Sequence, residues 1–254
     1  MEREIGDAGD FLNNSVASRA VNIAPDMSKV RRLDIYHRRY RKLMLGFGAA
    51  GVALLAGGVA LWSGNHQICG SLVGLLGLPL LYFASTFLQT LKGDAYRNGL
   101  LIPGIVSSLH PLTITCMADV RTGDDDEFED EDDKAGTISS IVWGIKQVVV
   151  NELTMHAAQL GERVPCVSLF GGEGEGEDGA FYTDFEPRPL AWGTADARTV
   201  EQARQAIDEE EWALLPQLAA AYEASEKNDN AIAYFDAALN PVSSAQPVAE
   251  DTNE

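Results

Sequence analysis

The sequence is poor in cysteine, with three in 254 residues, and poor in basic residues, with 19 lysines and arginines against 38 aspartates and glutamates. Three cysteines are too few for a disulfide-stapled domain. A formal net charge of −19 argues against a nucleic-acid partner for the main domain, because phosphate contacts need clustered Lys and Arg. Composition therefore excludes disulfide-rich scaffolds and disfavours nucleic-acid-binding domains.

Common catalytic motifs are absent as well. No G-x-S-x-G, P-loop or H-E-x-x-H pattern occurs. The run from Gly174 to Gly179 fits G-x-G-x-x-G, but it is acidic and precedes a strand-like run instead of the helix that a dinucleotide needs. We predict a flexible hairpin loop there, and we predict no catalytic residue, no cofactor and no metal site.

The cysteines and histidines form no metal-ligand pattern. Cys116, Cys166, His110 and His156 lack the close pairs that zinc sites show. A nucleophilic pair of either cysteine with His156 stays open as an enzyme alternative. In that case the folded domain should gather Cys166, His156 and Asp184 in one pocket.

Residues 43–91 contain no Asp, Glu, Lys or Arg. A membrane-spanning helix needs about 20 apolar residues, so this block predicts a transmembrane helical hairpin with spans at 43–62 and 68–90. The polar run 63–67 forms the turn. A soluble buried hairpin would need cover on every side, since neither helix shows a polar stripe. The absence of intramembrane charge disfavours an ion or proton path, and with it a transporter or pump.

Basic residues flank this block on both sides, and the turn has none. The positive-inside rule then places both termini in the cytoplasm. We expect the hairpin to lie in a bacterial inner membrane. Residues 27–42 have helical spacing and predict a basic amphipathic helix on anionic headgroups. The alternative is that these charges only fix topology. The residues expected at the membrane surface are Lys29, Arg31, Arg32, Arg38, Arg39, Arg41 and Lys42.

Small residues recur along both predicted spans. They let helix backbones approach closely in lipid. We expect them to pack the two helices of one hairpin together, with a homo-oligomer as the alternative. They are Ala49, Ala53, Gly57, Gly70 and Gly74.

Residues 124–133 hold nine carboxylates, interrupted only by Phe128. Like charges at this density extend a chain, so residues 123–134 are predicted to form an exposed, disordered loop between two strands. An EF-hand loop needs glycine at its sixth position, where Glu129 stands if counting starts at Asp124. A contact between this loop and the basic residues of segment 27–42 is a hypothesis based on opposite charge.

Residues 95–195 predict a mainly β cytoplasmic domain. Short apolar runs rich in Val, Ile, Thr and aromatic residues are bounded by turn residues, which favours an antiparallel sheet in a small barrel or sandwich. Residues 151–160 are a candidate short helix. The expected strands are 99–106, 112–120, 138–150, 164–170, 181–185 and 190–192.

Residues 196–240 have a helical pattern. Thr199 with Gln202 predicts a capped helix to residue 207, Asp208 with Glu211 predicts the start of the next, and a third is expected between residues 230 and 240. The last two helices resemble one tetratricopeptide unit, but one unit is too short for a stacked array. The residues to test for a partner surface or for core packing are Trp212, Tyr222 and Phe235. The tails 1–26 and 241–254 are predicted to be disordered.

Three short motifs carry a family resemblance: Gly99-Leu-Leu-Ile-Pro-Gly-Ile-Val, Cys116-Met-Ala-Asp-Val and Ala191-Trp-Gly-Thr. Together they resemble an uncharacterised membrane-protein family seen mainly in corynebacteria and other actinobacteria. The resemblance covers roughly residues 90–225. It implies a mainly β, barrel-like soluble domain attached to the membrane, and it transfers no functional residue.

The sequence thus predicts a two-helix transmembrane hairpin joined to an α+β soluble domain. The expected function is noncatalytic, namely a scaffold, adaptor or accessory subunit that presents an acidic domain to a protein partner of unknown identity. A membrane-tethered enzyme or a small component of a transport complex is the alternative.

Overall fold

The computed structural model describes residues 19, 21–64, 66–122, 141–176 and 179–242. The chain divides into two compact units, residues 26–94 and residues 1–25 together with 95–254. The predicted acidic loop, most of the N-terminal tail and residues 243–254 lie outside the described residues.

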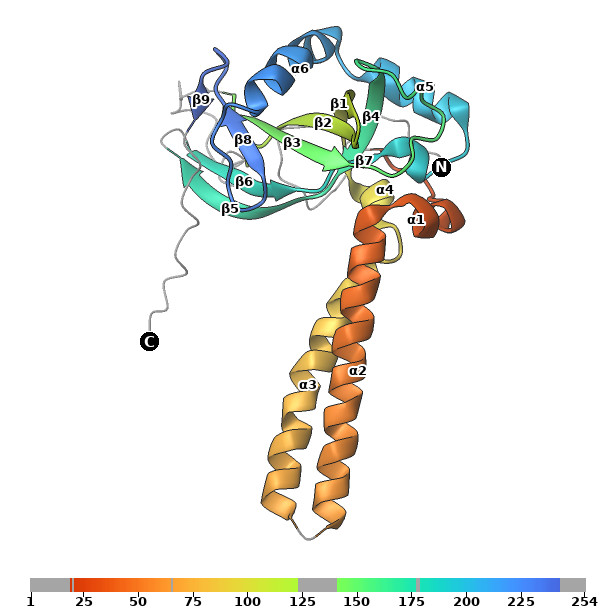
Figure 1. The fold of residues 1–254 in the computed structure, drawn as a ribbon, viewed down its shortest axis with the longest axis vertical. Coiled ribbons are helices and arrows are strands. Elements are labelled where there is room, and N and C mark those ends of the chain that lie inside the picture. The colour runs from red at the N-terminus through yellow and green to blue at the C-terminus, as the bar shows by residue number, and fades with distance from the viewer. Residues whose placement is uncertain (1–18, 20, 65, 123–140, 177–178, 243–254) are drawn as a thin grey trace, which may run out of the picture. The chain divides into compact units, whose positions relative to one another are not determined.

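The first unit is a pair of long antiparallel helices, α2 (Ile35–Ser63) and α3 (Gln67–Thr90), preceded by the short helix α1 (Met27–Leu33) (Figure 1). Both long helices are long and apolar enough to cross a membrane. Asp34 separates α1 from α2, because its carboxylate accepts hydrogen bonds from the amides of Tyr36 and His37 at 2.8 and 3.1 Å. The predicted basic helix 27–42 is therefore interrupted at Asp34, while its second half runs into the first span, as expected.

The second unit is built on a seven-stranded sheet with the order β7-β4-β1-β2-β3-β8-β9, in which all neighbours are antiparallel. A separate hairpin pairs β5 with β6. The fold class predicted from sequence is confirmed, except that the sheet is open and does not close into a barrel. The strands are β1 (Leu100–Leu109), β2 (Leu112–Asp119), β3 (Trp143–Val149), β4 (Arg163–Ser168), β5 (Phe170–Gly176), β6 (Gly179–Phe185), β7 (Arg188–Pro189), β8 (Ile232–Phe235) and β9 (Pro241–Val242).

The helices of this unit are α4 (Asp94–Asn98), α5 (Ala197–Ala206) and α6 (Glu209–Tyr222), with the 3-10 turn η2 (Leu190–Trp192). Figure 1 shows α6 along one face of the sheet, where it contacts β1, β2 and β3. The buried residues Leu215 and Leu218 of α6 close that side of the core. The helix continues through Pro216.

Several predicted elements differ from the structure. Residues 232–235 form β8, which pairs with β3, so the predicted third helix and the tetratricopeptide-like helix pair are wrong. Asn228 stabilises the turn into β8, because its side-chain oxygen accepts hydrogen bonds from the amides of Asn230 and Ile232. Residues 151–160 form turns in place of a helix, residues 190–192 are η2 in place of a strand, and the glycine-rich run 170–176 is a strand.

The residues just before the membrane unit pack in the soluble domain, so the predicted disorder of 1–26 is wrong for its described part. The amide of Leu101 donates to the carbonyl of Arg19 at 2.6 Å, and the amide of Val21 donates to that of Gly99 at 3.3 Å. The amide of Ile23 donates to the carbonyl of Tyr96 at 3.0 Å. Residues 19 and 21–23 therefore run beside residues 96–101, and the chain enters and leaves residues 26–94 at one place in this domain.

Candidate functional site

A polar cavity of about 640 Å³ opens in the soluble domain between α5 and the chain that leads into β4. Two residues with positive φ, Met155 and Gly161, shape this chain, and Gly161 suits that conformation because it has no Cβ. The side chains that give the cavity its chemistry are His156, Glu162, Arg163, Glu201 and Arg204.

The two arginines of the cavity are paired with carboxylates. Arg163 donates two hydrogen bonds of 2.8 Å to Glu209, at the first residue of α6. Arg204 donates to Glu201, one turn earlier on α5, at 2.9 and 2.7 Å. These pairs are partly exposed and screened by water, so they orient the guanidinium groups more than they stabilise the fold. The cavity walls carry charges of both signs.

His156 is the group without a complete set of partners. Its side chain is 5% exposed, and its Nδ1 lies 3.8 Å from the carboxylate of Glu162. Its Nε2 is buried and has no hydrogen-bond partner among the described residues. Burial lowers the pKa of His156, and this effect outweighs the attraction of Glu162. The imidazole is therefore neutral at pH 7 and can offer one nitrogen to a polar ligand.

We expect the protein to lose stability below about pH 6.5 in a way that depends on His156. The folded state holds the imidazole neutral, whereas the unfolded chain protonates it near pH 6.5. The stabilisation is therefore present above the unfolded pKa and is lost as the pH falls toward the lowered folded pKa. Urea unfolding of the full chain at about pH 7.5 and pH 5.5 should show a smaller pH effect for His156→Gln than for the wild type. An equal slope for both proteins would contradict this expectation.

The sulfur atoms of the domain's two cysteines lie close together beside Gly104. Cys116 on β2 and Cys166 on β4 are buried, and their sulfur atoms lie 3.7 Å apart across the intervening strand β1. A Cβ at Gly104 of β1 would stand 3.0 Å from both sulfurs. Burial raises the pKa of the Cys166 thiol well above its usual value, which makes it a poor nucleophile.

These thiols are not placed to form a disulfide. The strands that carry them are separated by two strand spacings, about 9.5 Å, whereas a disulfide needs Cα atoms within about 7 Å. Both cysteines are free thiols, as this geometry requires.

We expect Gly104→Ala to destabilise the domain by about 1–3 kcal/mol, because the added methyl group overpacks this contact. Replacing Cys166 with alanine should remove part of the clash, so Gly104→Ala should cost less in a Cys166→Ala background. Thermal unfolding of the four full-length proteins measures the difference. A cost of Gly104→Ala that does not change with the sulfur would contradict the packing explanation.

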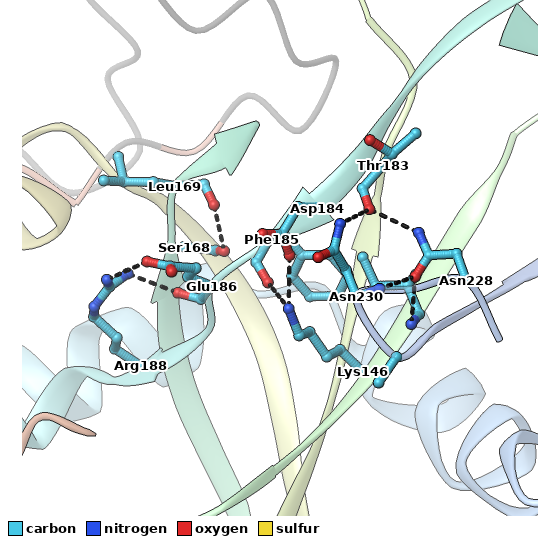
Figure 2. A network of polar contacts seen from close by, with 12 residues as sticks. Lys146, Ser168, Leu169, Thr183, Asp184, Phe185, Glu186, Arg188, Asn228 and Asn230 are labelled. Atoms are coloured by element: carbon cyan, nitrogen blue, oxygen red, sulfur yellow. Dashed lines mark hydrogen bonds and ion pairs between the residues drawn. The ribbon is translucent and has the colours of Figure 1, made fainter. Parts of the chain in front are cut away.

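A second polar cluster ties β3 and β6 to the turn before β8 (Figure 2). Lys146 donates to Asp184 at 2.7 Å and to the carbonyl of Phe185 at 2.8 Å. Asn228 and Asn230 donate to the carbonyl of Thr183 at 2.7 and 3.1 Å. Figure 2 shows these side chains converging on the end of β6, so the cluster stabilises the packing of β6 against β3 and the turn before β8.

The three residues named for an enzyme pocket do not line one common pocket. His156 lines the polar cavity, Asp184 is paired with Lys146, and Cys166 is packed against Cys116. The structure therefore does not form the Cys–His–Asp set of the enzyme alternative.

The aromatic residues named for a partner surface are buried. Trp212 donates from its indole nitrogen to the carbonyl of Arg204 at 3.3 Å, and Tyr222 donates from its hydroxyl to the carbonyl of Ala231 at 2.9 Å. Phe235 lies in β8 with no exposed surface. All three are core residues, which was the alternative, so they are not retained as a partner surface.

In the membrane unit, glycines form the contact between α2 and α3. A Cβ at Gly58 would stand 2.8 Å from the backbone of Gly74, and one at Gly70 would stand 2.7 Å from the backbone of Trp62. Gly57 makes a looser contact, because a Cβ there would stand 4.0 Å from Cγ1 of Val73. Ala49 and Ala53 are exposed and belong to another face of α2.

Sequence analysis missed Gly51, Gly58 and Gly77 in this contact. A Cβ at Gly51 would meet the carbonyl of Gly77 at 3.0 Å. Gly51 and Gly58 are seven residues apart, as are Gly70 and Gly77. This paired heptad spacing is the signal that could have identified them.

The basic residues named for the membrane surface are exposed, except that Lys29 is half-buried. Three of them, Arg38, Arg39 and Lys42, line a cavity of about 490 Å³ on α2. Arg31, Arg32 and Arg41 lie outside this cavity.

A family model described as "Protein of unknown function (DUF3239)" matches residues 91–223, which is more than half of the chain. The chain belongs to the DUF3239 family. The predicted resemblance to an uncharacterised family is thereby confirmed, while its actinobacterial scope stays a prediction. A search of the curated proteins gave no match.

One solved structure is similar to this DUF3239 chain: a crystal structure described as that of "a putative membrane protein from Corynebacterium diphtheriae". The two are 16% identical with a TM-score of 0.40, and the match covers 52% of this chain and 97% of the other.

The family match contains the polar cavity and all three motifs of the resemblance, and it ends before β8. Two motif glycines have a packing reason. Gly104 leaves space for the sulfurs of Cys116 and Cys166, and Gly193 leaves space for the ring of Tyr96. The DUF3239 motifs therefore describe a core.

Proposed function

We propose that this DUF3239 protein is a membrane-anchored, noncatalytic scaffold or adaptor of a bacterial inner membrane, with both termini in the cytoplasm. One observation carries the proposal: residues 19, 21 and 23 are hydrogen-bonded to residues 96–101, and these two segments bracket the apolar helix pair. A domain that holds both ends of the hairpin requires both ends on the same side of the membrane.

The surface of the helix pair supports a lipid environment. Val59 is 71% exposed and Ile68 is 79% exposed, and many other large apolar side chains of both helices are exposed as well. Exposed apolar surface costs about 25 cal/mol per Å² in water, whereas lipid covers it without that cost. The basic residues before α2 favour the cytoplasmic side for the ends of the hairpin.

The membrane anchor acts by confining the soluble domain to the membrane surface. Residues 43–254 carry a formal net charge of −22, all of it after the uncharged block 43–91. A tethered domain meets membrane-bound partners at a raised effective concentration. Its acidic surface favours partners with basic surfaces.

The topology can be tested by labelling single cysteines in a Cys69→Ser background. His66→Cys should react with a membrane-impermeant maleimide in intact cells, because it lies in the turn between the spans. Asp229→Cys, on the exposed turn before β8, should react only after permeabilisation. The reverse pattern, or recovery of the protein in the soluble fraction, would contradict the proposal.

The adaptor role can be tested by affinity purification of the full chain from mild detergent, with identification of what copurifies. A specific partner should be recovered at about 0.05 M salt and lost at about 0.5 M salt, because exposed charge pairs are screened. Recovery of the protein alone would contradict the adaptor role while leaving the topology untouched.

A second candidate, a membrane-tethered ligand-binding protein or enzyme, is favoured by the buried Nε2 of His156 beside the polar cavity. A thermal-shift screen of small polar metabolites tests it. Ligands of this cavity should stabilise the wild-type protein and fail to stabilise His156→Gln.

A further inference from the structure

Three neighbouring cations on α2 lack partners within the part of the chain that the structure describes. Among the described residues, the side chains of Arg38, Arg39 and Lys42 make no ion pair and no hydrogen bond. The soluble domain differs, although the chain has twice as many carboxylates as cations. Six of its cations are paired with carboxylates: Arg19, Arg121, Lys146, Arg163, Arg188 and Arg204. The cations on α2 are thus available to an external anion.

These cations surround one cavity. Positions 35, 38, 39, 42 and 43 follow the i, i+3, i+4, i+7, i+8 spacing of a single helix face, and all five line the space of about 490 Å³. Side chains three and four positions apart have Cβ atoms about 5–6 Å apart. Two guanidinium groups and one ammonium group at that spacing can surround the oxygens of a single phosphate. Ile35 and Leu43 add apolar walls to the same cavity.

An apolar groove continues along the same helix. Leu45, Ala49, Val52 and Ala56 line a depression of about 720 Å³, together with Leu81 and Ala84 of α3. The series 38, 42, 45, 49, 52, 56 advances by four and three residues alternately, so it stays on one face of α2. The cation cluster therefore lies at the end of a groove whose floor includes small side chains.

We propose that α2 carries a specific site for an anionic phospholipid, with its phosphate held by Arg38, Arg39 and Lys42 and one acyl chain in the groove below. The inference rests on the proposed membrane placement, which puts Lys42 at the headgroup level, one residue before the uncharged block begins. A free phosphate would leave the groove unfilled. A second copy of the helix in the same orientation would bring three like charges against these three, which is unfavourable.

The test compares two triple variants that remove the same charge. Native mass spectrometry of the full chain in detergent measures binding of phosphatidylglycerol and of phosphatidylcholine with the same acyl chains. The wild type should prefer phosphatidylglycerol. Arg38→Gln/Arg39→Gln/Lys42→Gln should weaken phosphatidylglycerol binding about 100-fold, where a tenfold change in affinity corresponds to about 1.4 kcal/mol of binding free energy. Arg31→Gln/Arg32→Gln/Arg41→Gln should leave phosphatidylglycerol binding nearly unchanged. Equal losses in both variants, or no preference in the wild type, would overturn the site.

The groove has its own control. Ala49→Leu/Ala53→Leu fills the depression and should weaken phosphatidylglycerol binding about tenfold, whereas Ala50→Leu/Ala60→Leu, on exposed positions outside it, should not. Displacement of the lipid by millimolar inorganic phosphate, or a change of oligomeric state in the groove variant with lipid binding retained, would overturn the lipid as occupant. Failure of the membrane placement would appear separately, in the cysteine-labelling experiment.

Discussion

Replacing Gly58 with leucine is expected to separate the two apolar helices. A Cβ at this position would stand 2.7 Å from the carbonyl oxygen of Gly70 and 2.8 Å from the Cα of Gly74. Both are backbone atoms, so no side-chain rotation can relieve the clash. Helix association in lipid depends on close backbone approach, and overpacking typically costs 1–3 kcal/mol or more. We therefore expect loss of the hairpin contact in Gly58→Leu.

Cross-linking can measure this contact directly. A Cβ at Gly48 would lie 3.9 Å from the Cβ of Ala84, which matches the usual Cβ separation in a disulfide. In a Cys69→Ser background, Gly48→Cys/Ala84→Cys should cross-link under mild oxidation, and adding Gly58→Leu should abolish the cross-link. Gly46→Leu is the control, because a Cβ at Gly46 meets nothing within 4 Å. Equal cross-linking in all three proteins would show that Gly58 does not determine helix packing.

The membrane unit shows what a single sequence can and cannot predict. The absence of charge over residues 43–91 was enough to predict both apolar helices, because the length and low polarity of a run are what identify a membrane-spanning helix. It was not enough to tell which stripe of small residues faces the partner helix. Every face of α2 is apolar there, so Ala49 and Gly58 look alike in sequence, and only the structure separates the exposed stripe from the packed one.

The soluble domain shows a related limit. Short apolar runs bounded by turn residues predicted β1, β2 and β4 correctly, and these strands are buried along almost their whole length. Residues 232–235 are too short for periodicity to distinguish a strand from a helix, and pairing with β3 decided their structure. The polar cavity was missed for another reason. Glu162 with Arg163, and Glu201 with Arg204, are each local in sequence, but only the packing of α5 against β4 brings them to one place.

Gly193→Ala is expected to destabilise the soluble domain strongly. Gly193 follows η2, and a Cβ there would stand 2.7 Å from Cε1 and 2.8 Å from Cγ of the Tyr96 ring. Tyr96 is buried, so the ring cannot turn away into solvent. We expect a loss of about 3 kcal/mol. That loss corresponds to a melting temperature lower by roughly 6–12 °C for a domain of this size.

The fluorescence of Trp192, which is buried beside Gly193, reports this unfolding in the full chain in detergent. Gly171→Ala is the matched control, because a Cβ there meets nothing within 4 Å and the change is the same methyl group. In a Tyr96→Ala background the cost of Gly193→Ala should fall to that of the control, since the ring that it strikes is gone. A cost that stays the same without the ring would mean that backbone conformation, and not the contact with Tyr96, requires glycine at position 193.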